Sequence, residues 1–146
     1  MGLLDESDGG LVTYLKSLSA VTALVGAGTA ARIKPDLAKR TWDTPYIVYT
    51  GAGGESPNHL LGIAGLRSQE VQISCYGGTR TQADQLAEAV KVNVQRQASQ
   101  TWASTFIDHV NCSALFSGVD KPEDDGDRPR YWTRLNLTIV HAEATS

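Results

Sequence analysis

The chain has 146 residues, 41% of them hydrophobic, and carries a formal net charge of -3 at pH 7. This length predicts one domain over residues 1–146, with a core large enough to fold without disulfide bonds or metals. The lack of a basic excess argues against a protein that grips many nucleic-acid phosphates, because such binding draws on clustered Lys and Arg.

The cysteines and the N-terminus predict the compartment. Cys75 and Cys112 are the only two cysteines, and we expect both to be reduced. The N-terminus is acidic where a signal peptide is basic, and Glu6 occupies the position at which myristoylation needs Ser or Thr. No apolar run approaches the roughly 20 residues of a membrane span. The sequence therefore predicts a protein made and kept in a cytoplasm-like compartment, with no membrane partner.

Residues 11–25 predict a helix. Apolar residues recur there at three- and four-residue intervals, which is typical of an amphipathic helix. Ser7 or Asp8 is the expected N-cap, a break is expected near Ser19, and Gly26 ends the helix.

Extended segments follow this helix. Residues 32–34 precede a proline, which favours a short extended piece, and residues 45–50 are β-branched and aromatic, which predicts a strand. Residues 51–58 contain three glycines and a proline, so we interpret them as a flexible loop. A short edge strand is expected over residues 60–66.

A strand and a helix are predicted for residues 67–94. Apolar and polar residues alternate over residues 71–76, which is typical of an antiparallel strand with one buried face. Thr79 and Gln82 have the spacing of a capping box. At 100° per residue, the apolar side chains of the following helix fall on one stripe, formed by Ala83, Leu86, Ala87, Val90 and Val94.

The last third predicts further strands. Residues 106–119 suit one or two short strands, residues 121–130 form an acidic loop, and residues 131–141 alternate as a long closing strand. These elements predict an α+β fold, a mostly antiparallel sheet with helices packed on one face. The other face is expected to be wet or covered by a partner, and its polar residues are Gln72, Ser74, Arg134, Asn136 and Thr138.

The segment from Gly26 to Ala31 matches the G-x-G-x-x-A dinucleotide fingerprint. That motif needs a strand before it and a helix after it. Here a helix is predicted before it, and Pro35 leaves no room for a helix after it. We therefore interpret Gly26 and Gly28 as residues that end a helix, and a small nucleotide-binding enzyme remains a distant alternative.

Other motifs fail at particular residues. Aligned as an EF-hand loop on Gly126, the acidic segment puts Lys121 at the first ligand position and Trp132 at the twelfth, which favours a solvated loop or a weak cation or partner contact. His109 and Cys112 supply two of the four ligands that a structural zinc site needs. There is no G-x-S-x-G nucleophile elbow. The sequence predicts no catalytic, cofactor or metal site, and a protein that is not an enzyme.

Several segments, taken in order, are typical of one family. They are the leading helix with Leu11, Leu15 and Leu18, then Arg32-Ile33, residues 45–49, residues 71–76, Thr79, Gln82-Ala83, Leu86-Ala87, and the closing strand over residues 130–140. This order resembles the small tail-completion proteins of long-tailed bacteriophages, also called tail-to-head joining or tail-terminator proteins. The resemblance covers most of the chain and is carried by structural residues.

The resemblance implies a structural virion protein made in the cytoplasm of a bacterial host. Six copies would form a ring at the head-proximal end of the tail tube, stop tube growth and join the tail to the head connector. The implied partners are further copies of this chain, the tail tube protein and a connector or stopper protein, with DNA passing through the lumen without specific binding. A head-side connector or stopper protein is the nearest alternative.

The resemblance carries over no contact residues, so candidate contacts rest on the strand pattern and the two loops. The candidate interface or lumen residues are Gly51, Gly53, Gly54, Glu55, Gln72, Ser74, Glu123, Asp124, Asp125, Asp127, Arg134 and Asn136. If the acidic loop faces the lumen, its charge would repel DNA phosphates and let the genome slide through.

Overall fold

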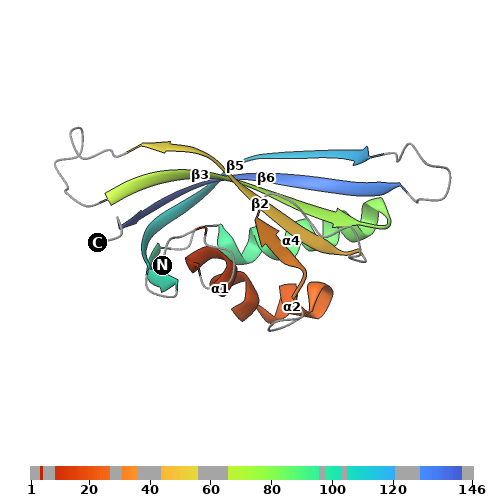
Figure 1. Ribbon diagram of the computed structural model, residues 1–146, viewed down its shortest axis with the longest axis horizontal. Coiled ribbons are helices and arrows are strands. Elements are labelled where there is room, and N and C mark those ends of the chain that lie inside the picture. The colour runs from red at the N-terminus through yellow and green to blue at the C-terminus, as the bar shows by residue number, and fades with distance from the viewer. Residues whose placement is uncertain are drawn as a thin grey trace.

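The six described strands form one twisted sheet, and the described helices lie on one side of it (Figure 1). The computed structural model describes residue 4 and residues 9–26, 31–35, 44–55, 66–95, 98–102, 105–120 and 129–142. The helices are α1 (Gly10–Ser17), α2 (Ser19–Val25) and α4 (Arg80–Val94). The strands are β1 (Ile33–Pro35), β2 (Tyr46–Glu55), β3 (Leu66–Gly77), β4 (Ala98–Trp102), β5 (Thr105–Asp120) and β6 (Arg130–Ala142).

The strands lie in the order β1-β2-β3-β6-β5-β4. Among the described strands, only β1 and β2 pair in parallel, and the other pairs are antiparallel. Helix α4 packs on β3 and β6, and α2 contacts β2. The predicted α+β fold is confirmed. None of the described helices is long and apolar enough to cross a membrane.

The N-terminal helical segment is interrupted near the predicted position. Leu18 has extended dihedral angles, φ -89° and ψ 112°, and separates α1 from α2. The predicted N-cap is wrong, since the extended residue before α1 is Gly9, with no capping side chain. Ser7 and Asp8 lie outside the described residues. Burial of the apolar side of α1 therefore stabilises this start without a side-chain cap.

Gly26 ends α2, as predicted. Its φ of 93° is in the region that favours glycine. The main-chain N–H of Arg32 then donates to the carbonyl of Val25 at 2.8 Å. The Nη2 of the Arg32 side chain donates to the carbonyl of Leu24 at 3.1 Å. Its Nε donates to the carbonyl of Pro45 at 3.0 Å. Arg32 thus satisfies the end of the helix and ties it to the start of β2.

The glycine-rich segment after Gly51 is a strand and not the predicted flexible loop. Residues 51–55 belong to β2 instead of a loop, and they pair with β3 through a register shift between Gly51 and Gly53. Main-chain hydrogen bonds to a long partner strand do not depend on side chains, so a bulge can accommodate the glycines. Residues 56–58 of the predicted loop lie outside the described residues. So does the expected edge strand, apart from Leu66, which belongs to β3.

Strand β5 also differs from expectation. In place of one or two short strands, residues 105–120 form one strand with register shifts between Ile107 and His109 and between Cys112 and Ala114. Each bulge adds a residue and moves the following side chains to the other face. A strict two-residue alternation is therefore lost in the sequence. Strand β4, which pairs with residues 105–109 of β5, was not predicted.

The capped helix was predicted correctly. The Thr79 side chain accepts a hydrogen bond from the Gln82 N–H at 3.1 Å. The Gln82 Oε1 accepts from the Gly78 N–H at 2.7 Å, one residue earlier than in a standard capping box. The predicted stripe is buried against the sheet, and it comprises Ala83, Leu86, Ala87, Val90 and Val94.

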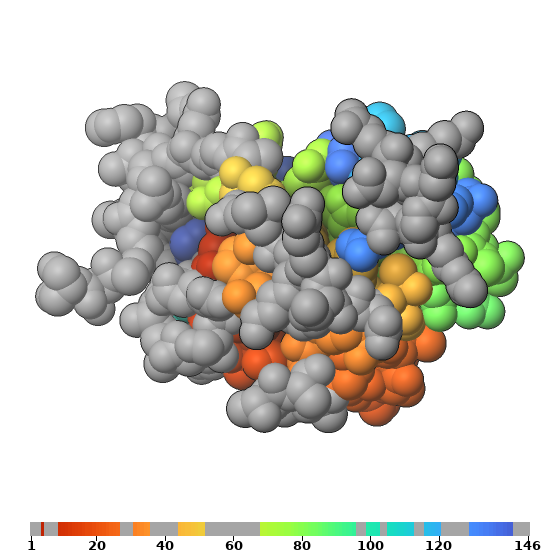
Figure 2. All heavy atoms as spheres, turned by 45° about the vertical axis from the view of Figure 1, so that its right-hand side comes forward, coloured from red at the N-terminus to blue at the C-terminus, as the bar shows by residue number. Residues whose placement is uncertain are grey.

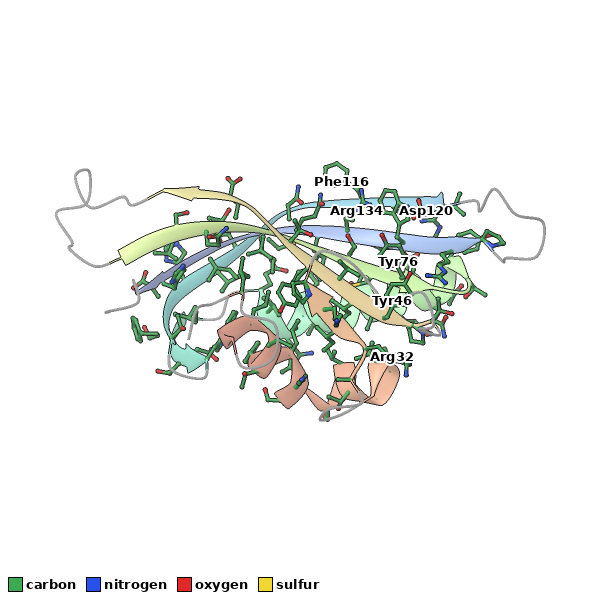
Figure 3. The ribbon with its side chains drawn as sticks, viewed as in Figure 1. Arg32, Tyr46, Tyr76, Phe116, Asp120 and Arg134 are labelled. Atoms are coloured by element: carbon green, nitrogen blue, oxygen red, sulfur yellow. The ribbon has the colours of Figure 1, made fainter. Side chains whose placement is uncertain are left out.

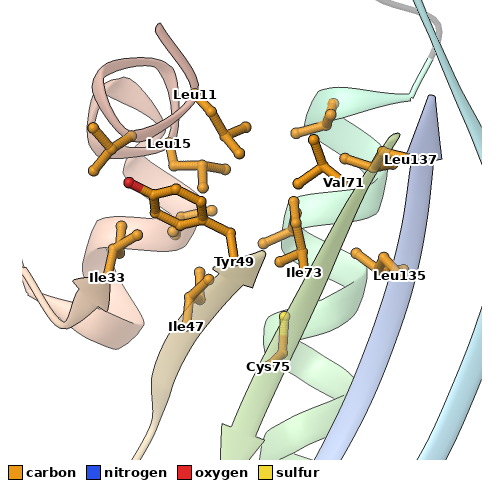
Figure 4. Packing of buried hydrophobic residues seen from close by; sticks show 14 of the residues in the cluster. Leu11, Leu15, Ile33, Ile47, Tyr49, Val71, Ile73, Cys75, Leu135 and Leu137 are labelled. Atoms are coloured by element: carbon orange, nitrogen blue, oxygen red, sulfur yellow. The ribbon is translucent and has the colours of Figure 1, made fainter. Parts of the chain in front are cut away.

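The core lies between the helices and the sheet (Figure 4). Val71, Ile73 and Cys75 point from β3 toward α4, which confirms the predicted buried face of that strand. At the other end of the core, Tyr14 of α1 stacks on Trp102 of β4, with ring centroids 4.3 Å apart. In Figure 2 the red and orange atoms of the N-terminal helices gather at the bottom of the molecule, with blue atoms of β6 above them.

Candidate functional site

The helix-free side of the sheet, called the open face below, brings several predicted residues together. In the register of β3 and β6, Gln72 lies opposite Asn136 and Ser74 lies opposite Arg134. These four side chains therefore share one face, as the alternation predicted. Figure 3 shows Arg134 on the side of the sheet away from the helices, and Phe116 of β5, its register partner, on the same side.

The other predicted residues are not part of this group. The second half of β2 contains Gly51, Gly53, Gly54 and Glu55. Glu55 is paired in register with Ser68 of β3, which is paired with Val140 near the end of β6. Glu123, Asp124, Asp125 and Asp127 lie outside the described residues, between Asp120 of β5 and Arg130 of β6. Asp120 and Arg130 pair at the opposite end of β6. Residues 51–55 of β2 and the pair Asp120 and Arg130, which flank the acidic segment in the chain, therefore lie toward opposite ends of the sheet.

Arg134 is the centre of a stack of side chains on the open face. Its guanidinium lies 4.0 Å from the ring centroid of Trp132, and its Nε donates to the Ser74 Oγ at 3.1 Å. Trp132 Nε1 donates to the Asp120 Oδ1 at 3.2 Å. The indole lies against the main chain of Gly118, its register partner on β5. These contacts fix the orientation of both the indole and the guanidinium.

A pair of stacked tyrosines extends this stack across the sheet. The rings of Tyr46 and Tyr76 are 4.7 Å apart and nearly parallel. Arg130 lies over the Tyr46 ring, and its Nη1 donates to the Tyr46 hydroxyl at 2.8 Å. Burial raises the pKa of Tyr46, and the hydrogen bond and charge of Arg130 oppose this only in part. The phenol therefore stays neutral and able to hydrogen bond at physiological pH.

We call this set the aromatic–arginine cluster. Aromatic rings and arginines are the side chains that contribute most to protein–protein binding, because they offer large contact areas at a low entropic cost. One member of the cluster, the large apolar side chain of Phe116, has 51% of its surface exposed. The members are Tyr46, Tyr76, Phe116, Asp120, Arg130, Trp132 and Arg134.

Sequence reasoning found only Arg134 of this cluster. Arg130, Trp132 and Arg134 occupy every second position of the closing strand, so their side chains point to the same face. The sequence alone could have shown this pattern. Phe116 and Gly118 could not have been placed, because the two bulges in β5 shift its alternation. The open face therefore carries aromatic rings as well as the polar residues that the sequence predicted.

The family comparison gives this surface a context. The sequence matches the family model of the tail completion protein gp17 over residues 9–142, which spans all the described helices and strands. The chain belongs to the tail completion protein gp17 family. It is therefore a structural component of a bacteriophage tail. No curated protein matches the sequence at a significant level.

The remaining motifs give this tail completion protein no chemical site within the described residues. Helix α2, not a strand, precedes Gly26, so the dinucleotide fingerprint lacks its required context, and Gly28 lies outside the described residues. No group of three or more His, Cys, Asp or Glu side chains that could hold a metal occurs in the described part of the chain. His109 contacts Asp108 at 2.7 Å on the surface, and Cys112 is in the reduced state.

Proposed function

We propose that six copies of this chain form a ring at the head-proximal end of the tail tube. The ring ends tube growth and joins the tail to the head connector, and the protein turns over no substrate. Membership in the tail completion family is the observation that carries this proposal. The open face supports it, because a sheet covered by helices on one side only leaves the other side available to neighbours.

A closed ring needs two different contact patches on each subunit, since each copy meets its neighbours head to tail. The aromatic–arginine cluster is suited to one such patch. Its rings and guanidiniums are already held in place by stacking and hydrogen bonds, so association orders few side chains. Alternatively, the aromatic–arginine cluster contacts the tail tube.

The acidic segment has a separate proposed role. We place Glu123, Asp124, Asp125 and Asp127 at the lumen, where their charge repels DNA phosphates and keeps the genome free to slide. Reversal of these four charges to lysine should then impair DNA passage and leave the ring intact. Unchanged infectivity or gene transfer would count against the lumenal position.

The ring is tested by mixing purified protein with tail tubes that lack their terminal ring. Electron microscopy and native mass measurement should find six copies capping one end of each tube. Binding to portal complexes but not to tubes would favour the alternative, a head-side connector or stopper protein. A protein that stays monomeric with both particles contradicts the ring.

A matched pair of variants tests the open face. Phe116 and Val92 are both exposed large apolar residues, but Phe116 lies on the open face and Val92 on α4. We expect Phe116→Ser to weaken ring assembly about tenfold or more, because truncation of an aromatic side chain at the buried centre of an interface costs about 1–2 kcal/mol or more. Val92→Ser should have no effect. Equal effects of both substitutions would show that the open face does not contribute to the contacts between subunits.

A further inference from the structure

Among the described strands, only β4 pairs with the outer edge of β5, and it does so over a small part of the length of β5. Strand β4 covers β5 only at residues 105–109. No described strand pairs with the outer edge of Val110–Asp120. Within this stretch Phe116, Ser117 and Val119 are exposed, whereas Val110 is buried. Alternate main-chain N–H and C=O groups of the stretch therefore point away from β6.

The opposite edge of the same sheet is likewise paired over only part of its length among the described strands. Strand β1 covers β2 only at Ile47–Tyr49. Among the described strands, none pairs with the outer edge of Thr50–Glu55, which lies beyond β1. This stretch holds Gly51, Gly53 and Gly54, and glycines within a strand often mark a place where another main chain approaches closely.

The two open stretches are at the same level along the sheet. Following the register across β3 and β6, Thr50 is level with Ala114, Gly51 with Cys112 and Gly54 with Val110. The open edge of β5 also continues beyond Ala114 as far as Asp120. It can therefore accommodate the stagger between strands that a curved sheet requires.

The strand directions are compatible with a cyclic arrangement. Strands β2 and β6 run one way, and β3 and β5 run the other. Rotation about an axis along the strands keeps these directions unchanged in the next copy. The β5 edge of one copy therefore meets the β2 edge of the next in antiparallel orientation, as needed to continue the alternation of the sheet.

We propose that the Val110–Asp120 edge of β5 pairs with the Thr50–Glu55 edge of β2 in the next copy of this chain. Main-chain hydrogen bonds then join the subunits, and the sheet continues from one copy to the next. A long open edge otherwise invites uncontrolled pairing, so it is normally blocked or covered. A second copy fits this role because its complementary edge is open at the same level. This inference rests on the proposed ring.

Amide hydrogen exchange tests the pairing on the unmodified protein. The outward-pointing amides of Val110–Asp120 and Thr50–Glu55 should exchange rapidly in the monomer, because no described strand protects them. In the ring on tail tubes, their exchange should slow by about 100-fold or more. The amides of Thr105–His109 provide the control, since β4 already pairs with this part of β5 in the monomer.

The possible results separate the inference from the proposed function. Slowed exchange on both edges, at alternate residues, supports the main-chain pairing. A ring that forms while both edges still exchange rapidly overturns the pairing and leaves the ring proposal standing. A protein that forms no ring on tail tubes overturns both.

Discussion

The indole of Trp132 lies so close to the main chain of Gly118 that residue 118 has no room for a side chain. A Cβ at this position would come within 2.7 Å of Cε2 and 2.8 Å of Cη2, distances that real Cβ atoms essentially never show. Gly118 thus allows the indole to lie flat across β5, where its outer surface supports the Arg134 guanidinium. The shape of the aromatic–arginine cluster depends on this one missing side chain.

Gly118→Ala should therefore displace the Trp132 indole. The cost in the free energy of unfolding is expected to be about 1–3 kcal/mol, as for other overpacked sites. Urea unfolding followed by circular dichroism gives this value, and tryptophan fluorescence reports the new environment of the ring. Gly51→Ala is the control, because its Cβ meets only the ends of two flexible side chains, Leu4 Cδ1 at 3.0 Å and Gln69 Nε2 at 3.4 Å. Equal costs for the two variants would contradict the close contact at Gly118.

Arg134→Ala should weaken assembly more than it weakens the fold. The substitution removes the stacking on Trp132 and the hydrogen bond to Ser74, which together stabilise a partly exposed site by about 1–2 kcal/mol. Native mass measurement over a concentration series should show ring formation at least tenfold weaker if the cluster is an interface. Arg134→Lys keeps the charge but loses the planar group, so we expect an intermediate effect. Full assembly by both variants would contradict the proposed contact.

Thr79→Ala should destabilise the protein by about 1 kcal/mol, because the Gln82 N–H loses its side-chain acceptor at the start of α4. Thr79→Ser keeps an oxygen in reach and should behave nearly as the parent protein. Thr81→Ala provides the control for removal of a threonine from the first turn, since Thr81 is exposed. The three variants are compared by urea unfolding, and a similar loss for Thr79→Ala and Thr81→Ala would show that the cap contributes nothing.

Cys75 should make the stability of the protein fall at alkaline pH. Its thiol is completely buried, and this burial raises its pKa well above the ordinary value. In the unfolded chain the thiol ionises above about pH 8.5, while in the folded protein it stays protonated. The folded state then binds more protons than the unfolded state, so the free energy of unfolding falls as pH rises, by about 2 kcal/mol between pH 8 and pH 10 for this group.

The comparison that tests this effect uses Cys75→Ala, which lacks the thiol but keeps Cys112. Urea unfolding at several pH values between 8 and 10 should show a smaller loss of stability with pH in the variant. A thiol reagent applied to the folded parent protein should also modify Cys112 alone, since Cys75 is inaccessible. Identical pH dependences would show that Cys75 ionises as readily in the folded protein as in the unfolded chain.

The sequence by itself determined the elements whose signals are local. The alternation over residues 71–76, the cap at Thr79 and the apolar stripe of α4 depend on neighbouring residues only, and all were predicted correctly. The break near Ser19 and the end of the helix at Gly26 are local signals too. With the closing strand, they were enough to predict the α+β class and the side of the sheet that the helices cover.

The tertiary structure alone decided what depends on a partner strand. The segment Gly51–Glu55 is extended because β3 supplies main-chain partners, although its glycines favour a loop. The bulges of β5 shift its side chains, so only the register with β6 places Gly118 beneath Trp132 and Phe116 beside Arg134. Strand pairing and register are long-range properties, and they determine both the aromatic–arginine cluster and the open edges of the sheet.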